Sequence, residues 1–179
     1  MRKTVLVLLL VFAATAAFAN SHMEMKPSPK TRDLDYYGGN WSCKGTAMAS
    51  PMAPEHPTAA NVTAKWTAGG YWLAFTYAET KTAKSAMPFW VSGFFGYDME
   101  QKKFVMGSVD NMGGYSTSTS DGWSGDTMTF EGPWHMTAMT VKGRDTFMKT
   151  SATAMVHTAF VEDGGSWKKL AEETCTKMK

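Results

Sequence analysis

The chain has little cysteine, little charge bias and no familiar catalytic motif. Its 179 residues include 18 lysine and arginine, 16 aspartate and glutamate, and 2 cysteine. Because there is no basic excess and no lysine/arginine block, the composition disfavours a nucleic-acid-binding protein. No G-x-S-x-G, H-E-x-x-H or phosphate-loop pattern occurs, so the sequence predicts no enzyme. After the first nineteen residues, no apolar run is long enough to span a bilayer.

Aromatic and apolar residues are plentiful. Hydrophobic residues make up 44% of the chain and aromatic residues 13%. That is enough material for a packed core, so the composition excludes low-complexity disorder. The length suits one globular domain with a tail.

The N-terminus resembles a secretory signal. Arg2 and Lys3 precede an apolar run at 5–12, and an A-x-A cleavage pattern lies at 17–19. We therefore predict that residues 1–19 are a signal peptide and that the mature protein is exported, either to the periplasm or to the medium. The residue directly after the cleavage site is Asn20 and not a cysteine, which disfavours a lipid anchor.

Ten short segments have the alternation or turn spacing of strands. Such spacing with almost no helix indicates a sandwich or a barrel in one domain over 36–179. The predicted strands are 40–48, 60–68, 71–79, 89–98, 103–109, 115–120, 128–134, 146–153, 155–162 and 167–177.

A polar segment and a short helix precede the strands. Residues 20–35 are predicted to form a flexible tail and the start of a helix over 29–37. Ser28 is a suitable N-cap and Pro29 a suitable first helical residue, while a glycine pair follows Tyr37. Such a helix would be placed to close one end of a barrel.

The two cysteines, Cys43 and Cys175, lie in the first and last predicted strands. Those strands are neighbours when a sheet closes on itself, so we predict a disulfide between them in an oxidising compartment. The chain-entropy account gives such a bridge about 4–5 kcal/mol as an upper limit. Two unpaired buried thiols are the alternative.

Several motifs are similar to those of one bacterial family. GNWSCKG at 39–45 resembles the G-x-W-x-G-x-G opening of lipocalin-like barrels. FGYD at 95–98 with KKFV at 102–105 resembles the family's hairpin, and VDNMG at 109–113 its turn. The family is known only as a domain of unknown function, number fifteen seventy-nine. The resemblance covers about 36–178 and implies a closed antiparallel β-barrel of the lipocalin or nitrobindin type, without an assigned activity. Cys43 departs from the middle glycine of the opening.

A barrel of this size encloses room for side chains or one small ligand. We therefore predict a small hydrophobic ligand in the lumen and no membrane span after signal removal, in a monomer or weak dimer. The alternative is a filled barrel that acts through exposed aromatic residues as an interaction module in the envelope. The predicted ligand-binding residues are Trp72, Phe75, Trp90, Tyr115 and Trp134.

Two cofactors are weaker hypotheses. Thioether and imidazole ligands suit copper in an exported protein, although no copper motif is complete. The weak metal candidates are His22, Met23, Met25, His56, His135 and Met136. Haem follows only from the resemblance, because nitrobindin-type barrels bind it through a histidine on a late strand. His157 lies on a late strand, but no surrounding motif matches, so no haem ligand is assigned.

Four polar residues are candidates for catalysis: Asp98, Asp110, His135 and His157. Asp98 and Asp110 lie in predicted turns, where aspartate caps backbone N–H groups. We therefore predict a turn role for both aspartates and no catalytic residue.

Overall fold

The computed structural model describes residues 26–50, 54–81 and 87–179. The predicted signal peptide and the tail up to residue 25 lie outside the described residues. No helix in the described part of the chain is both long and apolar enough to cross a membrane.

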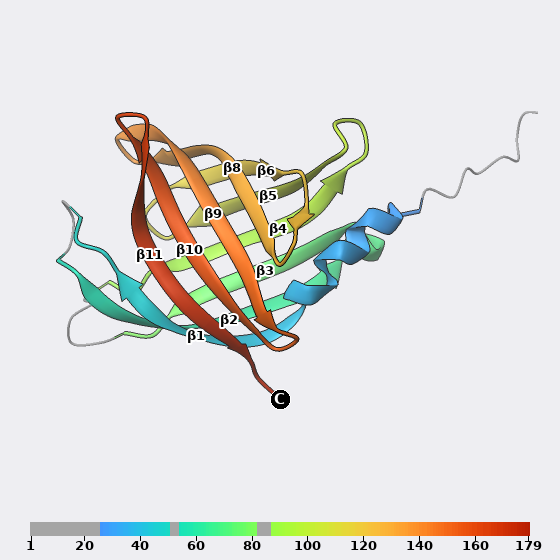
Figure 1. Cartoon of the computed structure of the whole chain (residues 1–179), viewed down its shortest axis with the longest axis horizontal. Coiled ribbons are helices and arrows are strands. Elements are labelled where there is room, and N and C mark those ends of the chain that lie inside the picture. Colours follow the sequence, from blue (N-terminus) through green and yellow to red (C-terminus); the bar gives the residue numbers. More distant parts are fainter. Residues whose placement is uncertain (1–25, 51–53, 82–86) are drawn as a thin grey trace, which may run out of the picture.

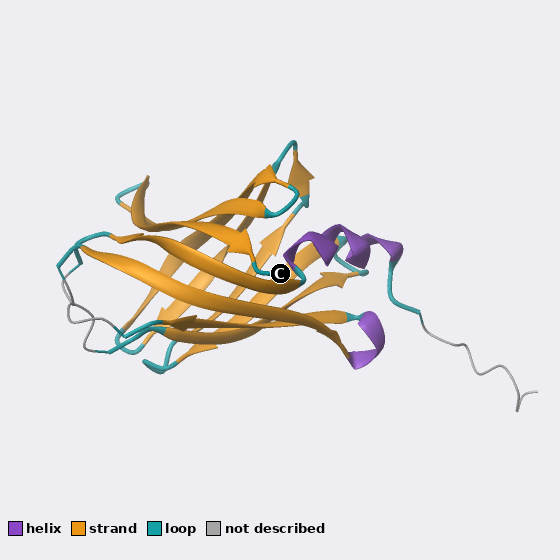
Figure 2. Ribbon diagram, turned by 90° about the horizontal axis from the view of Figure 1, so that it is seen from below, coloured by secondary structure: helices purple, strands orange, loops and turns teal. Residues whose placement is uncertain are grey.

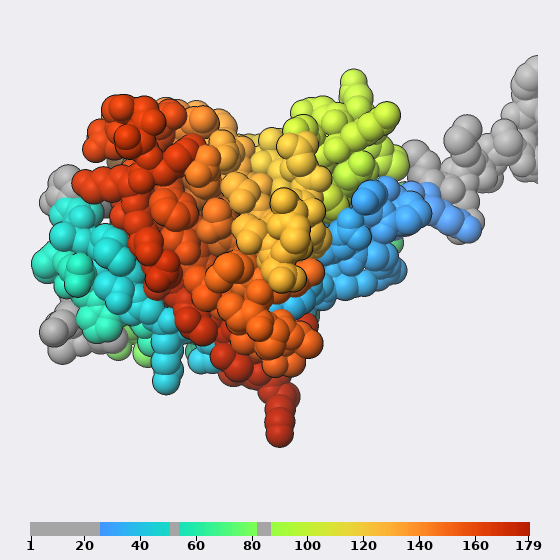
Figure 3. Space-filling model, viewed as in Figure 1, coloured from blue at the N-terminus to red at the C-terminus, as the bar shows by residue number. Residues whose placement is uncertain are grey.

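The chain forms a closed antiparallel β-barrel of ten strands (Figure 1). Neighbours in sequence pair in turn, β1 pairs with β11, and β6 pairs with β8 to close the wall. The two-residue strand β7 pairs only with β8 and is an extra strand. Viewed from one side, β8 to β11 present a wall of packed side chains (Figure 3). The strands are β1 (Gly39–Ala47), β2 (His56–Thr67), β3 (Trp72–Glu79), β4 (Trp90–Asp98), β5 (Lys103–Asp110), β6 (Tyr115–Ser120), β7 (Trp123–Ser124), β8 (Thr127–Met136), β9 (Met139–Ser151), β10 (Ala154–Asp163) and β11 (Ser166–Lys177).

Each of the ten predicted segments overlaps one strand of the barrel, and two of the predicted bounds are wrong. β9 begins at Met139 rather than at 146, because it pairs with β8 along the whole hairpin. β2 begins at His56 rather than at 60 and so includes Pro57. Pro57 is tolerated there because β2 pairs with β3 only from Ala60 onward, so no ladder bond to β3 is lost.

The register places one face of every strand inside the barrel. Cross-strand partners point to the same side, so the buried side chains define the inner face. The buried apolar side chains are Leu34, Tyr37, Trp41, Cys43, Ala60, Ala64, Leu73, Phe95, Phe104, Met106, Met128, Phe130, Phe147, Met155 and Cys175. They make one cluster.

A 3₁₀ helix, η1 (Pro29–Tyr37), lies across one end of the barrel (Figure 2). It occupies the residues for which a short helix was predicted, and the Ser28 side chain caps it by accepting the Lys30 N–H. Leu34 is fully buried, and the Tyr37 ring stacks on Phe95 with 5.1 Å between ring centroids. The helix therefore fills this end with side chains.

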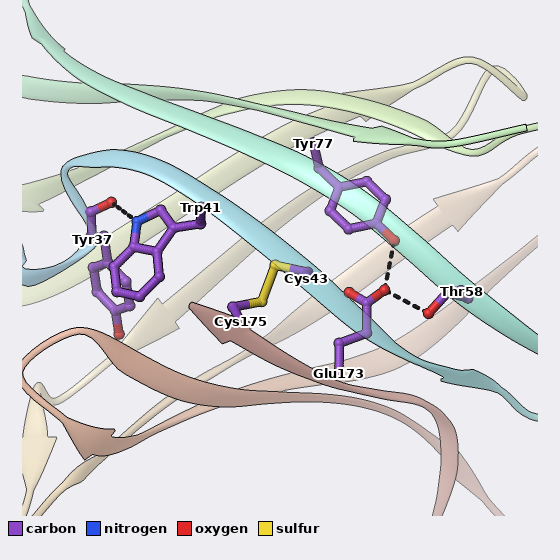
Figure 4. The surroundings of a disulfide bond; sticks show 7 residues. All are labelled: Tyr37, Trp41, Cys43, Thr58, Tyr77, Glu173 and Cys175. Atoms are coloured by element: carbon purple, nitrogen blue, oxygen red, sulfur yellow. Dashed lines mark hydrogen bonds between the residues drawn. A yellow bond between two sulfur atoms is a disulfide. The ribbon is translucent and has the colours of Figure 1, made fainter. Parts of the chain in front are cut away.

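A disulfide joins β1 to β11. Cys43 and Cys175 are directly paired in the ladder and form the predicted disulfide, which is buried on the inner face (Figure 4). The two strands approach so closely at Gly45 that an added Cβ would lie 1.9 Å from the Glu172 carbonyl oxygen. The glycine is therefore required by this approach.

Candidate ligand-binding site in the barrel

The inner face changes character along the barrel axis. Near η1 the inward residues are large and fully buried, as at Trp41, Leu73 and Phe130. We call this the closed half. Toward the other end the inward positions are small and only partly buried: Ala47, Ser108, Ser116, Ala159 and Ala171. We call this the open half. Side chains that point inward yet keep accessible surface border a lumen that solvent can enter.

Two aromatic rings of the open half lie flat against the wall. An added Cβ at Gly93 would lie 2.6 Å from the Phe75 ring, and one at Gly143 would lie 2.0 Å from the Trp134 ring. Each ring thus covers a glycine on the neighbouring strand instead of projecting toward the barrel axis. The small side chains and flattened rings together give this part of the inner face apolar surface and few bulky groups that project from it.

A carboxylate lies at the boundary between the two halves, beside the disulfide. Glu173 is 4% exposed, and its Oε1 accepts hydrogen bonds from Thr58 Oγ1 at 2.7 Å and Tyr77 Oη at 2.9 Å (Figure 4). Burial, together with the charge and hydrogen bond of Glu173, raises the pKa of Tyr77 far above its usual range. Tyr77 therefore remains a donor, which holds Glu173 in place.

A histidine–aspartate pair faces the same space. His157 is the cross-strand partner of Glu173, and its Nε2 lies 2.9 Å from Asp145 Oδ1. The His157 side chain keeps 23% of its surface exposed although it points into the barrel. Burial by itself would lower the pKa of His157, but the hydrogen bond with Asp145 and the negative charges of Asp145 and Glu173 outweigh burial and raise it.

A second buried carboxylate lies on β3. Glu79 has a side chain only 5% exposed, and its Oε2 accepts the Phe89 N–H at 2.8 Å. Its Oε1 is buried without a hydrogen bond; His56 Nε2 lies 3.9 Å from it. Burying a carboxylate oxygen without a hydrogen-bond donor costs free energy. Glu79 Oε1 is therefore able to accept a hydrogen bond from a ligand.

Comparison with known families matches the chain, over residues 26–177, to the family described as "Protein of unknown function (DUF1579)". The chain belongs to this family. The DUF1579 match agrees with the resemblance carried by the sequence motifs, and the description assigns no activity. A search of curated proteins found no match.

A solved structure, that of Rv2717c from M. tuberculosis, shares the fold of this DUF1579 chain. The TM-score is 0.62 at 10% sequence identity, over 86% of this chain and 100% of that chain. At that identity the likeness shows the fold alone. The proposed kinship with lipocalins or nitrobindins stays a prediction.

Two of the five predicted ligand-binding residues point into the lumen, namely Phe75 and Trp134. The other three lie on the outer face: Trp72 is 37% exposed, Trp90 40% and Tyr115 54%. The aromatic excess on β3 and β4 misled the prediction, because both faces of these strands carry large rings. Trp72 covers Gly96 on the outside, as Phe75 covers Gly93 on the inside.

The metal candidates are not brought together among the described residues. His56 lies at the start of β2, whereas His135 stacks on Tyr115 outside the barrel and its Nδ1 meets Thr140. Met136 is exposed, and His22, Met23 and Met25 lie outside the described residues. Cys43, Glu173 and Cys175 cluster tightly enough for a metal, but the two sulfurs are bonded to each other.

The two aspartates among the candidates for catalysis cap backbone N–H groups in turns. Asp98 Oδ1 accepts the N–H groups of Glu100 and Gln101, and Asp110 Oδ1 accepts those of Met112 and Gly114. The predicted turn role is confirmed for both.

Sequence reasoning missed the inward acids. Leu73, Phe75 and Tyr77 alternate along one face of β3, and Glu79 continues that alternation. Glu173 lies two residues before Cys175 and therefore on the same face of β11. The available signal was the period-two alternation, which places Glu79 on the same face as Tyr77 and Glu173 on the same face as Cys175.

Proposed function

We propose that the protein binds a small amphipathic molecule inside its barrel. The observation that carries the proposal is the open half, where inward alanines and serines keep accessible surface while Phe75 and Trp134 lie flat on glycines. A stably folded barrel has no structural need for such a lumen, because large side chains fill the other half completely.

The ligand needs both an apolar and a polar part. Phe75 and Trp134 offer apolar surface, whereas Glu173 and the His157–Asp145 pair offer polar groups. Pockets that combine apolar walls with a few fixed polar groups are typical of small-molecule binding sites. This refines the predicted hydrophobic ligand into an amphipathic one.

The test is binding of the neutral dye N-phenyl-1-naphthylamine, followed by fluorescence. We expect saturable binding at one site. Ser108→Phe places a ring in the lumen and should weaken binding at least about tenfold, equivalent to about 1.4 kcal/mol. Val109→Phe adds a ring to the outer face of the same strand and should leave binding unchanged.

Absence of saturable binding would contradict the proposal, as would equal loss in both variants. Thermal melting of each variant checks that the barrel is intact.

Export belongs to the same proposal. Disulfides form and persist in oxidising compartments, so the Cys43–Cys175 bond supports export. The pattern over 1–19 supports cleavage of a signal peptide. Native mass spectrometry of the protein from the exported fraction measures the cleavage site, the disulfide and any retained ligand together. An intact N-terminus in the mature fraction would contradict export by this signal.

A second candidate function rests on the outer aromatics of β3 and β4. Trp72 and Phe94 pack edge to face with 5.0 Å between centroids, and both are exposed, as is Trp90. Exposed rings gathered on one sheet face favour association, here with a second copy of the chain. Light scattering over a concentration series should show weak dimers that Phe94→Ser removes.

A further inference from the structure

The open half of the lumen carries an excess of negative charge. Three carboxylates, Glu79, Asp145 and Glu173, face it together with His56 and His157. The three acids exceed the two histidines in number even if both histidines are counted as positively charged. No lysine or arginine of the described residues forms an ion pair with these three acids; Lys168 is exposed at the rim, opposite Val161.

The carboxylates also retain capacity to accept hydrogen bonds. Both hydrogen bonds described for Glu173 end on Oε1. Glu79 Oε1 is buried and accepts none. An ammonium group supplies up to three N–H donors and a positive charge, and a hydrogen bond with a charged partner is about twice as strong as a neutral one.

The spacing of the acids favours an organic cation over a metal ion. Among the described residues, no three of these acids and histidines have ligand atoms that all lie within 4.8 Å of one another; Glu173 forms such a group with the two disulfide sulfurs. A single metal ion needs several oxygens at about 2.0–2.6 Å, and these acids and histidines do not assemble a set of three such ligands. An ammonium group needs only one or two carboxylates as acceptors, and the apolar part of the same ligand would lie against the rings.

The aromatic lining fits the same ligand class. Tyr77 and Phe89 lie with ring centroids 6.3 Å apart, and Tyr77 joins the Glu173 carboxylate to the aromatic wall. Cations are attracted to aromatic faces, most strongly where water is displaced. Apolar ligands with a carboxylate or phosphate would instead meet like charge in this space.

We infer that the lumen selects a small apolar molecule with a primary ammonium group, held by Glu173 and Glu79. This inference rests on the proposed function, since it names the ligand class of the same site. The open half then discriminates among amphipathic molecules by charge as well as by size.

The experiment compares three probes of equal chain length, octylammonium, 1-octanol and octanoate, by isothermal titration calorimetry at neutral pH. The protein is the mature, disulfide-bonded chain. We expect octylammonium to bind about tenfold more tightly than 1-octanol, and octanoate to bind most weakly. Glu173→Gln and Glu79→Gln should each weaken octylammonium about tenfold and leave 1-octanol within about twofold.

Glu172→Gln is the matched control. Glu172 is the next residue along β11, lies on the outer face and accepts a hydrogen bond from Lys169, so its substitution should leave all three affinities unchanged. Because Glu173→Gln also alters a buried network, Glu79→Gln provides an independent variant, and thermal melting reports folding of both.

The outcomes separate the two claims. If 1-octanol binds and octylammonium binds no more tightly, the ammonium inference is overturned while lumen binding stands. If none of the probes binds the folded protein, both claims are overturned. If calcium or zinc ions displace octylammonium at equal concentration, the site is a metal site and the inference is overturned.

Discussion

The two halves of the lumen are built from the same ten strands, but their inward side chains differ in size and polarity. In the closed half, η1 and rings such as Phe95 and Phe130 fill the barrel, and Trp41 donates its indole N–H to the Tyr37 carbonyl at 2.9 Å. In the open half, alanine, serine and glycine take many inward positions, the Phe75 and Trp134 rings lie flat on glycines, and acids take other inward positions. The comparison teaches that the closed half supplies the stability that lets the open half remain accessible.

Truncating one ring in each half gives the sharpest test of this difference. Phe130→Ala in the closed half should lower the free energy of unfolding by about 3–5 kcal/mol, because it leaves a cavity among fully buried neighbours. Phe75→Ala in the open half should cost about 1–2 kcal/mol, because part of that ring already borders accessible space. Urea denaturation measures the loss of unfolding free energy in each variant, and the two losses are compared directly when the m-values of the variants equal that of the parent protein. Equal losses would show that the two halves are packed alike.

Removing the disulfide tests the boundary between the halves. The double substitution Cys43→Ala with Cys175→Ala should cost about 2–5 kcal/mol, since the bridge closes a loop with a sequence separation of 132 residues. Dithiothreitol should lower the stability of the parent protein to a similar level and leave the double variant unaffected. A parent protein whose stability is insensitive to reductant would show that the bridge contributes nothing.

The His157–Asp145 pair should make the open half sensitive to pH. The raised pKa of His157 means that the folded state holds this proton more tightly than the unfolded chain. The resulting stabilisation is fully present below the unfolded pKa of about 6.5 and is lost as pH rises through the folded pKa.

Asp145→Asn removes the charged partner and should cost about 1.5–3 kcal/mol below about pH 6, and less in alkaline solution. Urea denaturation across the pH range measures the loss, and proton NMR follows the His157 titration directly. Asp163→Asn, in an exposed position next to the β10–β11 turn, should show no such pH dependence. A constant cost at all pH values would mean that His157 does not carry the effect.

The smallest effect is expected outside the barrel. Tyr115→Ser removes a 54% exposed ring that stacks on His135, so the free energy of unfolding should change by no more than about 0.5 kcal/mol. Affinity for N-phenyl-1-naphthylamine should be unchanged, because the side chain lies outside the lumen. Loss of dye binding in this variant would place the site on the outer face.

Much of the architecture follows from local patterns. Period-two alternation located the ten barrel strands, and Ser28 with Pro29 located η1. The bounds of β2 and β9 were missed because each extends through residues of weak strand propensity, Pro57 in β2 and Gly143 in β9, that only pairing with a neighbour holds in place.

By itself, then, the sequence determined the positions of the ten strands, the pairing of Cys43 with Cys175 and the turn roles of Asp98 and Asp110, because each depends on residues close together in the chain or on a covalent constraint. Only the tertiary structure decided which side of Trp72 and Trp90 is the inside, since both faces of their strands carry rings. The tertiary structure also brings the Thr58 and Tyr77 hydroxyls into hydrogen bonds with Glu173. These residues come from three strands, and barrel closure brings them within hydrogen-bonding distance across 115 and 96 positions of sequence.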